Sequence, residues 1–315
     1  MLSQTSSDRR AWQASTVGDP ASWYYRLPAR CLAALDEAVG AWRRQLRPIV
    51  DVRVDGGPLA ECAADLHPVR RALEEERGFV IIEGVPVERY SVPELQLLYW
   101  LVGQLLGRPQ EQNVQGTLLY DVRDTGQDVR YGARFSVTNA ESTFHTDNSF
   151  GAEVTDYVGL LCIRTARSGG LSQVVSGYTA YDRLLAEHPE VLEVLSQPFH
   201  VDRRGGVRPG EPPTVRVPIL HRDGEKLLCR YLRYWIEVGH EKAGQPLTAE
   251  QVRALDVFDR VLTDPALRAE FPLKPGDMYF INNRWILHNR TAFEDHPEPE
   301  RKRHLVRLWL RATQG

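Results

Sequence analysis

Short apolar runs separated by turn-forming residues fill the chain from about residue 114 onward, and this pattern limits the folds that the chain can adopt. Each run is rich in Val, Ile, Leu and aromatic residues, which is typical of β-strands. The runs do not alternate regularly with helices, so a parallel sheet built from βαβ units is disfavoured. The pattern predicts an antiparallel barrel or a double-sheet jelly roll. The runs are "GTLLYDVR", "YVGLLCI", "SQVVS", "TVRVPILHRDGEKLLCRYL", "GDMYFINN" and the final strand "RHLVRLWLR".

The N-terminal part of the chain carries helical patterns instead. Residues 29–46 and 66–78 place apolar residues at helical spacing, and the second of these segments is expected to end at Gly78. The segment "GFVIIEGVP" at 78–86 then changes period and predicts a buried strand. Residues 1–30 are polar and predict an N-terminal arm.

Two further helices are marked by their N-terminal caps. Ser91 precedes a strongly apolar segment, with Pro93 in the first turn and Glu94 three residues after the cap, which is a capping box. Thr248 caps a helix over residues 248–264, the one late helix expected within the strand series.

The composition allows a globular protein and argues against two classes of partner. Of 315 residues, 42% are hydrophobic and 26% are charged, which is enough apolar material for a core. The formal net charge of −3 gives no basic footprint for nucleic acid. No segment reaches the ~18 apolar residues that a membrane span needs. Cys31, Cys62, Cys162 and Cys229 are far apart without a CxxC pair, so we expect a cytoplasmic protein without a cysteine zinc site.

Three His-x-Asp triplets occur, at 145–147, 200–202 and 221–223, so the triplet alone is weak support for a metal site. The last lies in a predicted hairpin turn, where an exposed Asp is ordinary. The second precedes the charged stretch "RRGG", and we expect Asp202 to pair with a neighbouring arginine. The first lies between Phe144 and Phe150 at the head of the strand-rich region, where residues i and i+2 of a strand share one face.

His288 is the best candidate for a third ligand beside His145 and Asp147. It follows the predicted strand "MYFI" in the segment "NNRWILHNR", directly after the apolar and aromatic residues "WIL". Two imidazoles and one carboxylate on one face form the facial triad of non-haem Fe(II) oxygenases. A lone histidine in such a setting is more often a core residue, so the hypothesis depends on all three residues together.

The final strand contains an arginine that needs an anion. Arg303, Leu305, Arg307 and Trp309 alternate with His304, Val306, Leu308 and Leu310, and Arg307 has apolar neighbours on both sides, so it is expected on a strand with two covered faces. A buried guanidinium without an anion costs several kcal/mol, and arginine suits bidentate binding of a carboxylate. The partner is a protein carboxylate, water at an edge strand or, next to a metal triad, a dicarboxylate cosubstrate.

These segments resemble the taurine dioxygenase-like family of Fe(II)- and 2-oxoglutarate-dependent oxygenases, in the clavaminate synthase-like superfamily. The resemblance covers about residues 75–312. It implies a mainly β fold with flanking helices, a double-stranded β-helix or jelly roll. Residues 31–315 then form one dioxygenase domain, with a helical N-terminal part and a jelly-roll core from about residue 78. The segments that carry the resemblance are "GFVIIEGVP", "FHTDNSF", "SGGLSQVVSGYTAYDRL", "LKPGDMYFINNRWILHNRTAF" and "RKRHLVRLWL".

The resemblance implies a role for each matching residue. It identifies His145, Asp147 and His288 as iron ligands. Arg307 matches the partner of the far carboxylate of 2-oxoglutarate, and Ser172 is at the place of a hydroxyl that serves the same group. Arg303 matches a second basic position near the keto-acid end. The segment "TAFEDHPEPERK" lengthens the gap between His288 and Arg307 relative to simpler members.

The implied reaction couples O2 and 2-oxoglutarate, with release of succinate and CO2, to oxidation of an unactivated C–H bond in a small molecule. Halogenating relatives replace the carboxylate ligand by a small residue, so retention of Asp147 favours hydroxylation. Desaturation, ring closure and stereoinversion use the same iron site and stay open. Two alternatives also stay open: a metal oxygenase of this fold that does not use 2-oxoglutarate, and a catalytically silent binding protein.

Substrate identity is not readable, but five residues are candidates for the pocket. A glutamate there would suit a cationic, amine- or amino-acid-derived small molecule. Nucleic acid and membranes are not expected as partners, and a homo-oligomer stays open. The pocket candidates are Glu141, Asn148, Phe150, Tyr120 and Arg230.

Overall fold

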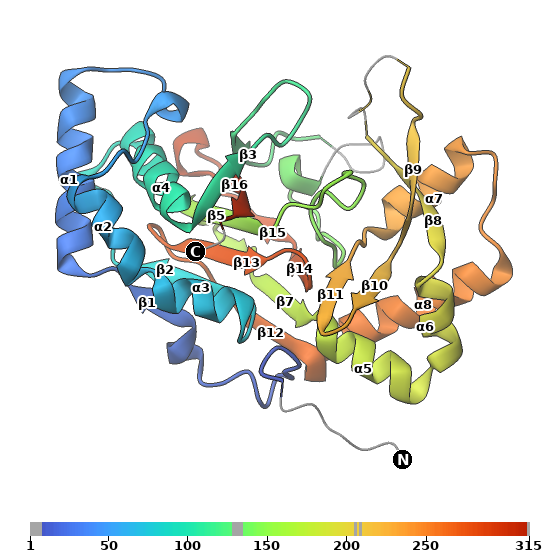
Figure 1. Ribbon diagram of the computed structural model, residues 1–315. Helices are drawn as coiled ribbons and strands as arrows, with labels where there is room; N and C mark the ends of the chain where they lie inside the picture. The colour runs from blue at the N-terminus through green and yellow to red at the C-terminus, as the bar shows by residue number, and fades with distance from the viewer. Residues whose placement is uncertain (1–7, 128–134, 205–206, 208–209, 314–315) are drawn as a thin grey trace.

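The computed structural model describes residues 8–127, 135–204, 207 and 210–313. Its centre is a seven-stranded sheet that faces a three-stranded sheet, and together they form a jelly roll (Figure 1). The large sheet has the order β1-β2-β13-β5-β16-β3, with β4 also paired to β16. Its strands are β1 Tyr24–Arg26, β2 Phe79–Glu83, β3 Gly107–Gln110, β4 Leu119–Val122, β5 Tyr157–Arg164, β13 Met278–Asn282 and β16 His304–Ala312.

The smaller sheet supplies the opposite wall, and three two-stranded ribbons surround it. Its order is β12-β7-β14, all antiparallel. The strands are β12 Arg268–Phe271, β7 Ser172–Ser176 and β14 Ile286–Arg290, and the ribbons are β6 Ser168–Gly169 with β15 Phe293–Glu294, β8 Pro198–Asp202 with β9 Thr214–Pro218, and β10 Leu220–Asp223 with β11 Lys226–Cys229.

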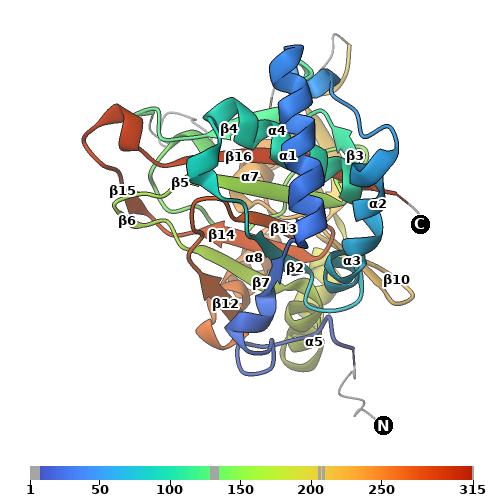
Figure 2. The ribbon, with the colours of Figure 1, turned by 90° about the vertical axis from the view of Figure 1, so that its left-hand side faces the viewer.

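Helices cover the outer face of the large sheet (Figure 2). The first four pack on the outer face of the large sheet, and the last four pack beside the small sheet. None of the described helices is long and apolar enough to cross a membrane. The helices are α1 Ala29–Arg44, α2 Gly57–Asp65, α3 His67–Glu74, α4 Val92–Leu106, α5 Gly177–Glu187, α6 Pro189–Leu195, α7 Arg233–Lys242 and α8 Ala249–Thr263.

The large sheet is buried on both faces because its strands alternate between two apolar clusters. On β16, Val306 and Leu308 join the outer cluster with α1 to α4, whereas Leu305 and Trp309 join the inner cluster between the sheets. Residues i and i+2 of a strand share a face, so Arg307 points inward. The alternation predicted from the sequence for this strand is confirmed.

Both predicted capping boxes are present, at Ser91 and at Thr248. The expectation of one late helix was incomplete, because α5, α6 and α7 also form. Helix α7 has the sequence "RYWIEVGHEK", whose aromatic and β-branched residues carry weak helix propensity. Tertiary packing stabilises this helix, because α7 packs closely on β8. The approach is so close that a Cβ on Gly239 would lie 2.5 Å from the carbonyl oxygen of His200 on β8.

The two other triplets have different surroundings. The 221–223 triplet lies on the β10–β11 hairpin with His221 and Asp223 exposed, as predicted. In the 200–202 triplet, His200 and Asp202 are only 9% and 2% exposed on β8, and the expected arginine partner of Asp202 was wrong. Asp202 binds the Nζ of Lys242 at 2.8 Å rather than an arginine side chain, since α7 packs against this strand.

We predict that Gly78→Ala is strongly destabilising. Gly78 has φ +74°, and a Cβ there would lie 2.3 Å from Trp285 and 2.7 Å from Ile286. Left-handed strain costs about 1–2 kcal/mol and overpacking about 1–3 kcal/mol more. Gly57→Ala is the matched control, since Gly57 has φ +70° but no atom within 4 Å of a Cβ. Urea unfolding should show a clearly larger loss for Gly78→Ala, and equal losses would contradict this packing.

Candidate active site

Backbone pairing fixes two histidines side by side. The N–H of His145 donates to the carbonyl of His288 at 3.0 Å, and the N–H of His288 donates to that of His145 at 2.9 Å. This isolated bridge attaches the loop before β5 to strand β14. The two imidazole ring centroids are 4.2 Å apart. The main chain therefore sets the spacing of the two rings.

The side chain of Asn283 holds the main chain of Asp147 with two hydrogen bonds. The side-chain oxygen of Asn283 accepts the N–H of Asp147 at 2.7 Å, and its amide donates to the carbonyl of Asp147 at 2.9 Å. Asp147 Oδ1 then lies 3.6 Å from His145 Nε2 and 4.0 Å from His288 Nε2. One donor atom of each residue lies within 4.8 Å of the others. The predicted trio is brought together.

The protonation states of the trio suit a metal. Burial lowers the pKa of His288 to about 3 and also lowers the pKa of His145, so both imidazoles are neutral at pH 7. Burial alone would raise the pKa of Asp147, but Arg307 and the two imidazoles hold it at about 2. The Nδ1–H of His145 donates to the carbonyl of Thr143 at 2.7 Å, which leaves its Nε2 lone pair for a ligand bond. Two neutral imidazoles and one carboxylate fit Fe(II).

The second oxygen of Asp147 is already occupied. Trp309 donates its indole N–H to Asp147 Oδ2 at 2.8 Å, and Arg307 Nη1 lies 3.1 Å from the same oxygen. Arg307 also donates through Nε to Gln112 at 2.7 Å, and its guanidinium lies 5.1 Å from the ring centroid of Tyr120. Only Oδ1 therefore faces the two histidines.

Arg303 is a buried cation that faces the cavity between the sheets. It is 6% exposed, and its side chain makes no hydrogen bond or ion pair with the described residues. Its guanidinium packs 4.9 Å from the ring centroid of Phe293. Burial lowers its pKa to about 10, so it stays charged at pH 7. A charged group in this position is suited to an anionic ligand.

The five predicted substrate residues divide into two groups. Asn148 and Phe150 line the cavity, as does the predicted cosubstrate residue Ser172. The other three are not among the described residues of the cavity wall: Glu141 is exposed, Tyr120 packs against Arg307, and Arg230 donates to the carbonyl of Gly151 at 2.7 Å. Of the three candidates nearest to His145 in the sequence, Asn148 and Phe150 therefore line the cavity and Glu141 does not.

Sequence reasoning missed several wall residues. Arg290 lines the cavity and lies two residues after His288 on β14, so the period of a strand could have identified it. Gln112, Arg204 and Trp235 come from segments without a local signal for this site. Their positions depend on contacts between distant elements.

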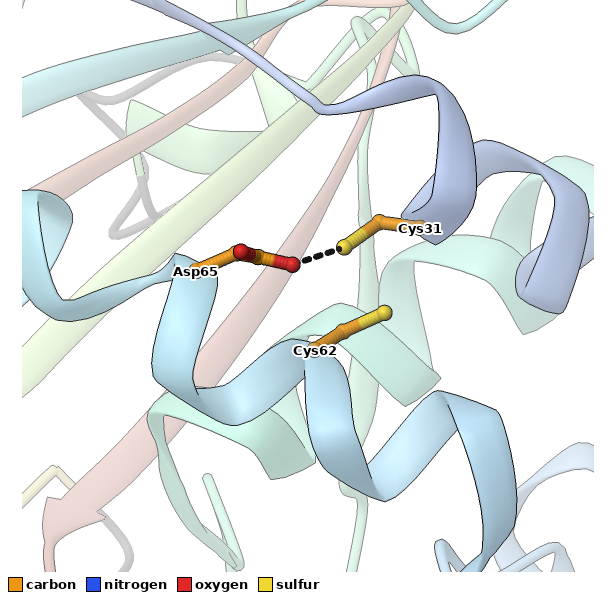
Figure 3. A group of neighbouring side chains, drawn as sticks. All are labelled: Cys31, Cys62 and Asp65. Atoms are coloured by element: carbon orange, nitrogen blue, oxygen red, sulfur yellow. Dashed lines mark hydrogen bonds between the residues drawn. The ribbon is translucent and has the colours of Figure 1, made fainter.

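A second group of ligand-type residues lies far from this cavity, in the outer cluster. Cys31 on α1 and Cys62 and Asp65 on α2 point toward one another (Figure 3), with donor atoms within 4.8 Å. The sequence expectation had not foreseen this proximity of two cysteines. The Cys31 thiol lies 3.0 Å from Asp65, and Arg30 binds the same carboxylate. Burial raises the pKa of Cys31, so the group is a protonated, internally satisfied contact between two helices.

Comparison with known proteins agrees with this site. The family model "Taurine catabolism dioxygenase TauD, TfdA family" matches residues 42–309. FR-33289 synthase of Streptomyces rubellomurinus is 30% identical over 320 residues, covering 100% of this chain and 93% of that protein. Enduracididine beta-hydroxylase of Streptomyces hygroscopicus is 26% identical over 71% of this chain and 76% of that protein.

Solved structures share the fold. A complex of asparagine oxygenase with Fe(II), hydroxyasparagine and succinate has a TM-score of 0.69 at 19% identity, covering 92% of this chain and 94% of the other. The non-heme iron oxygenase OrfP with Fe and alpha-ketoglutaric acid has a TM-score of 0.68 at 20% identity, with the same coverage. This likeness confirms the predicted jelly roll with flanking helices.

We predict that Trp309→Phe weakens metal binding while the fold is kept. The change removes the N–H that holds Asp147 Oδ2, and loss of such a supporting hydrogen bond typically costs about 10- to 100-fold in metal affinity. Trp100→Phe is the matched control, because Trp100 donates at the same distance of 2.8 Å to Val52 in the outer cluster. Titration with Fe(II) without oxygen should separate the two variants. Equal affinities would show that Trp309 does not support the ligand.

Proposed function

The chain belongs to the taurine catabolism dioxygenase TauD/TfdA family, and from this premise we propose that His145, Asp147 and His288 hold its iron. The protein is an Fe(II)- and 2-oxoglutarate-dependent dioxygenase that oxidises a C–H bond of a small molecule. The observation that carries the ligand assignment is the convergence of Asp147 Oδ1 and two imidazole Nε2 atoms at 3.6 and 4.0 Å. Their protonation states and main-chain clamps support it.

When bound, Fe(II) would activate O2, the oxidant of the C–H bond, and 2-oxoglutarate would supply two electrons as it is converted to succinate and CO2. The residues of the chain have other tasks. Trp309 and Arg307 occupy Asp147 Oδ2, so that the carboxylate presents a single oxygen to the iron. The apolar wall formed by Val158, Leu160 and Leu232 limits water near the reacting centre.

For the cosubstrate, we assign the two arginines differently from the sequence expectation. Arg303 is the better partner for the far carboxylate of 2-oxoglutarate, because it is buried, faces the cavity and its side chain makes no ion pair with the described residues. Arginine binds a carboxylate in a bidentate manner. Arg307 is instead held at 3.1 Å from Asp147 and supports the iron site. Ser172, which also lines the cavity, keeps its proposed role as a hydroxyl donor to the cosubstrate.

The substrate class is a small molecule, and we propose one derived from an amino acid. The support comes from similar proteins: the structures of asparagine oxygenase and OrfP hold hydroxyasparagine and hydroxyarginine, respectively. The reaction that we propose is hydroxylation, as the names of several relatives describe. A carboxylate-bearing substrate also agrees with the arginines of the cavity wall.

The test adds Fe(II) and then 2-oxoglutarate to the protein without oxygen and follows the weak visible metal-to-ligand charge-transfer band. We predict that Arg303→Gln weakens 2-oxoglutarate binding by about 30-fold or more, equivalent to about 2 kcal/mol, since it removes one partner of a buried charge pair. Arg301→Gln is the control, because Arg301 is exposed and two residues away.

The outcomes separate the competing assignments. His288→Ala should abolish the band. The Arg303→Gln variant should still show the band, but only at high 2-oxoglutarate concentration. Bound iron with no band in the unmodified protein would reject these site assignments and favour an oxygenase that does not use 2-oxoglutarate. Unchanged affinity in Arg303→Gln would return the carboxylate role to Arg307.

A further inference from the structure

Residues 291–302, "TAFEDHPEPERK", form the segment that connects β14 to β16 and ends directly before Arg303. Strand β15 of this connecting segment pairs with β6, which lies shortly before Ser172 in the chain (Figure 2). The N–H of Gly170 extends this contact by donating to the carbonyl of Ala292 at 3.1 Å. The connecting segment therefore lies beside both residues that we assign to the far carboxylate of 2-oxoglutarate.

We propose that the connecting segment fixes the guanidinium of Arg303 and thereby sets the length of the 2-oxo diacid that the site accepts. Phe293 and Asp295 are its positioning residues. The inference rests on the proposed function, because it deepens the assignment of Arg303 to the cosubstrate.

Phe293 borders the side chain of Arg303. It is 4% exposed, and the guanidinium carbon of Arg303 lies 4.9 Å from its ring centroid. The backbone of Gly170 is close as well, because a Cβ there would lie 3.5 Å from Nε of Arg303 and 3.5 Å from Cβ of Phe293. An aromatic ring attracts the cation but supplies no anion. These contacts therefore restrict the guanidinium and leave its charge for a ligand.

Asp295 fixes the main chain from which the side chain of Arg303 starts. Its Oδ1 accepts the N–H of Arg303 at 2.7 Å, one residue before β16 begins at His304. Its Oδ2 is buried and has no hydrogen-bond partner among the described residues, so the carboxylate does not hold the guanidinium. One side chain of the connecting segment thus holds the backbone of Arg303, and another borders its charged group.

These contacts fix one end of the cosubstrate site, and the three candidate metal ligands fix the other. A 2-oxo acid chelates iron through its first carboxylate and the adjacent keto group, so its methylene groups set the distance to the far carboxylate. 2-Oxoadipate has one methylene group more than 2-oxoglutarate. A fixed Arg303 should discriminate between the two acids, whereas a mobile Arg303 should tolerate the longer one.

The test titrates the Fe(II)-loaded protein with 2-oxoglutarate and with 2-oxoadipate, without oxygen, and follows the charge-transfer band. We predict that the unmodified protein binds 2-oxoglutarate about tenfold tighter or more, the effect of one methylene group in a fitted site. The ratio of the two affinities is the readout, because a general loss of stability would not change it selectively.

Asp295→Ala should reduce this ratio about threefold or more, since it removes the hydrogen bond that anchors Arg303. The affinity for Fe(II) should stay unchanged. Asp295→Asn keeps an oxygen that can accept the N–H and should retain the ratio. Phe293→Leu should also reduce it, but Arg290 lies 4.7 Å from the same ring, so the Asp295 variants decide.

Asp19→Ala and Phe258→Leu are the matched controls, and neither position is among the described residues of the cavity wall. Asp19 Oδ1 also accepts a main-chain N–H, that of Ala21 at 2.8 Å, and Phe258 is 0% exposed on α8. Both controls should leave the ratio unchanged.

Equal binding of the two acids by the unmodified protein would overturn the proposal. So would an unchanged ratio in Asp295→Ala, an equally large loss in Asp295→Asn, or the same loss in the controls. The absence of a band with 2-oxoglutarate, or unchanged affinity for it in Arg303→Gln, would instead mark failure of the proposed function.

Discussion

Two main-chain hydrogen bonds between His145 and His288 are the constraint on which the site depends. They attach an irregular loop to a strand of the smaller sheet, and the side chains of both residues then meet at one point. Asn283 does the same for Asp147 through its side-chain amide. Hydrogen bonds to the backbone of all three residues therefore set the positions from which the donor atoms converge. This is the preorganisation that a functional site on rigid elements requires.

The large sheet separates two environments, an apolar outer cluster and the cavity that contains the candidate metal ligands. Its outer face packs against α1 to α4 in an apolar cluster, in which Cys31, Cys62 and Asp65 satisfy one another. Its inner face carries Arg303, Arg307 and Trp309 into the cavity opposite the smaller sheet. Placing arginines where water is scarce makes anions the natural ligands of this space. These arginines therefore agree both with a dicarboxylate cosubstrate and with the proposed carboxylate-bearing substrate.

Much of this arrangement was predictable from local pattern. The alternation on the last strand predicted that Arg303 and Arg307 share a face, and the spacing of His145 and Asp147 predicted a shared direction. The sequence did not predict that Arg307 pairs with Asp147 while Arg303 is left to face the cavity. A distance of 3.1 Å connects Arg307 to Asp147, and this contact joins segments 160 residues apart in the chain. The exposed position of Glu141 was not predictable either, since sequence proximity to a ligand does not give the direction of a loop.

The sequence by itself determined which residues are periodic, which helices begin at caps, and which three side chains could bind a metal. Periodicity and caps depend on neighbours within a few residues, whose geometry is nearly fixed by the backbone, and the metal trio was chosen by ligand type. The tertiary structure alone decided that His200 and Asp202 are buried, that "RYWIEVGHEK" is a helix, and that Trp235 meets Arg204. Burial and charge pairing depend on which faces of distant elements meet. No local period encodes that choice, because it is made by the packing of the whole chain.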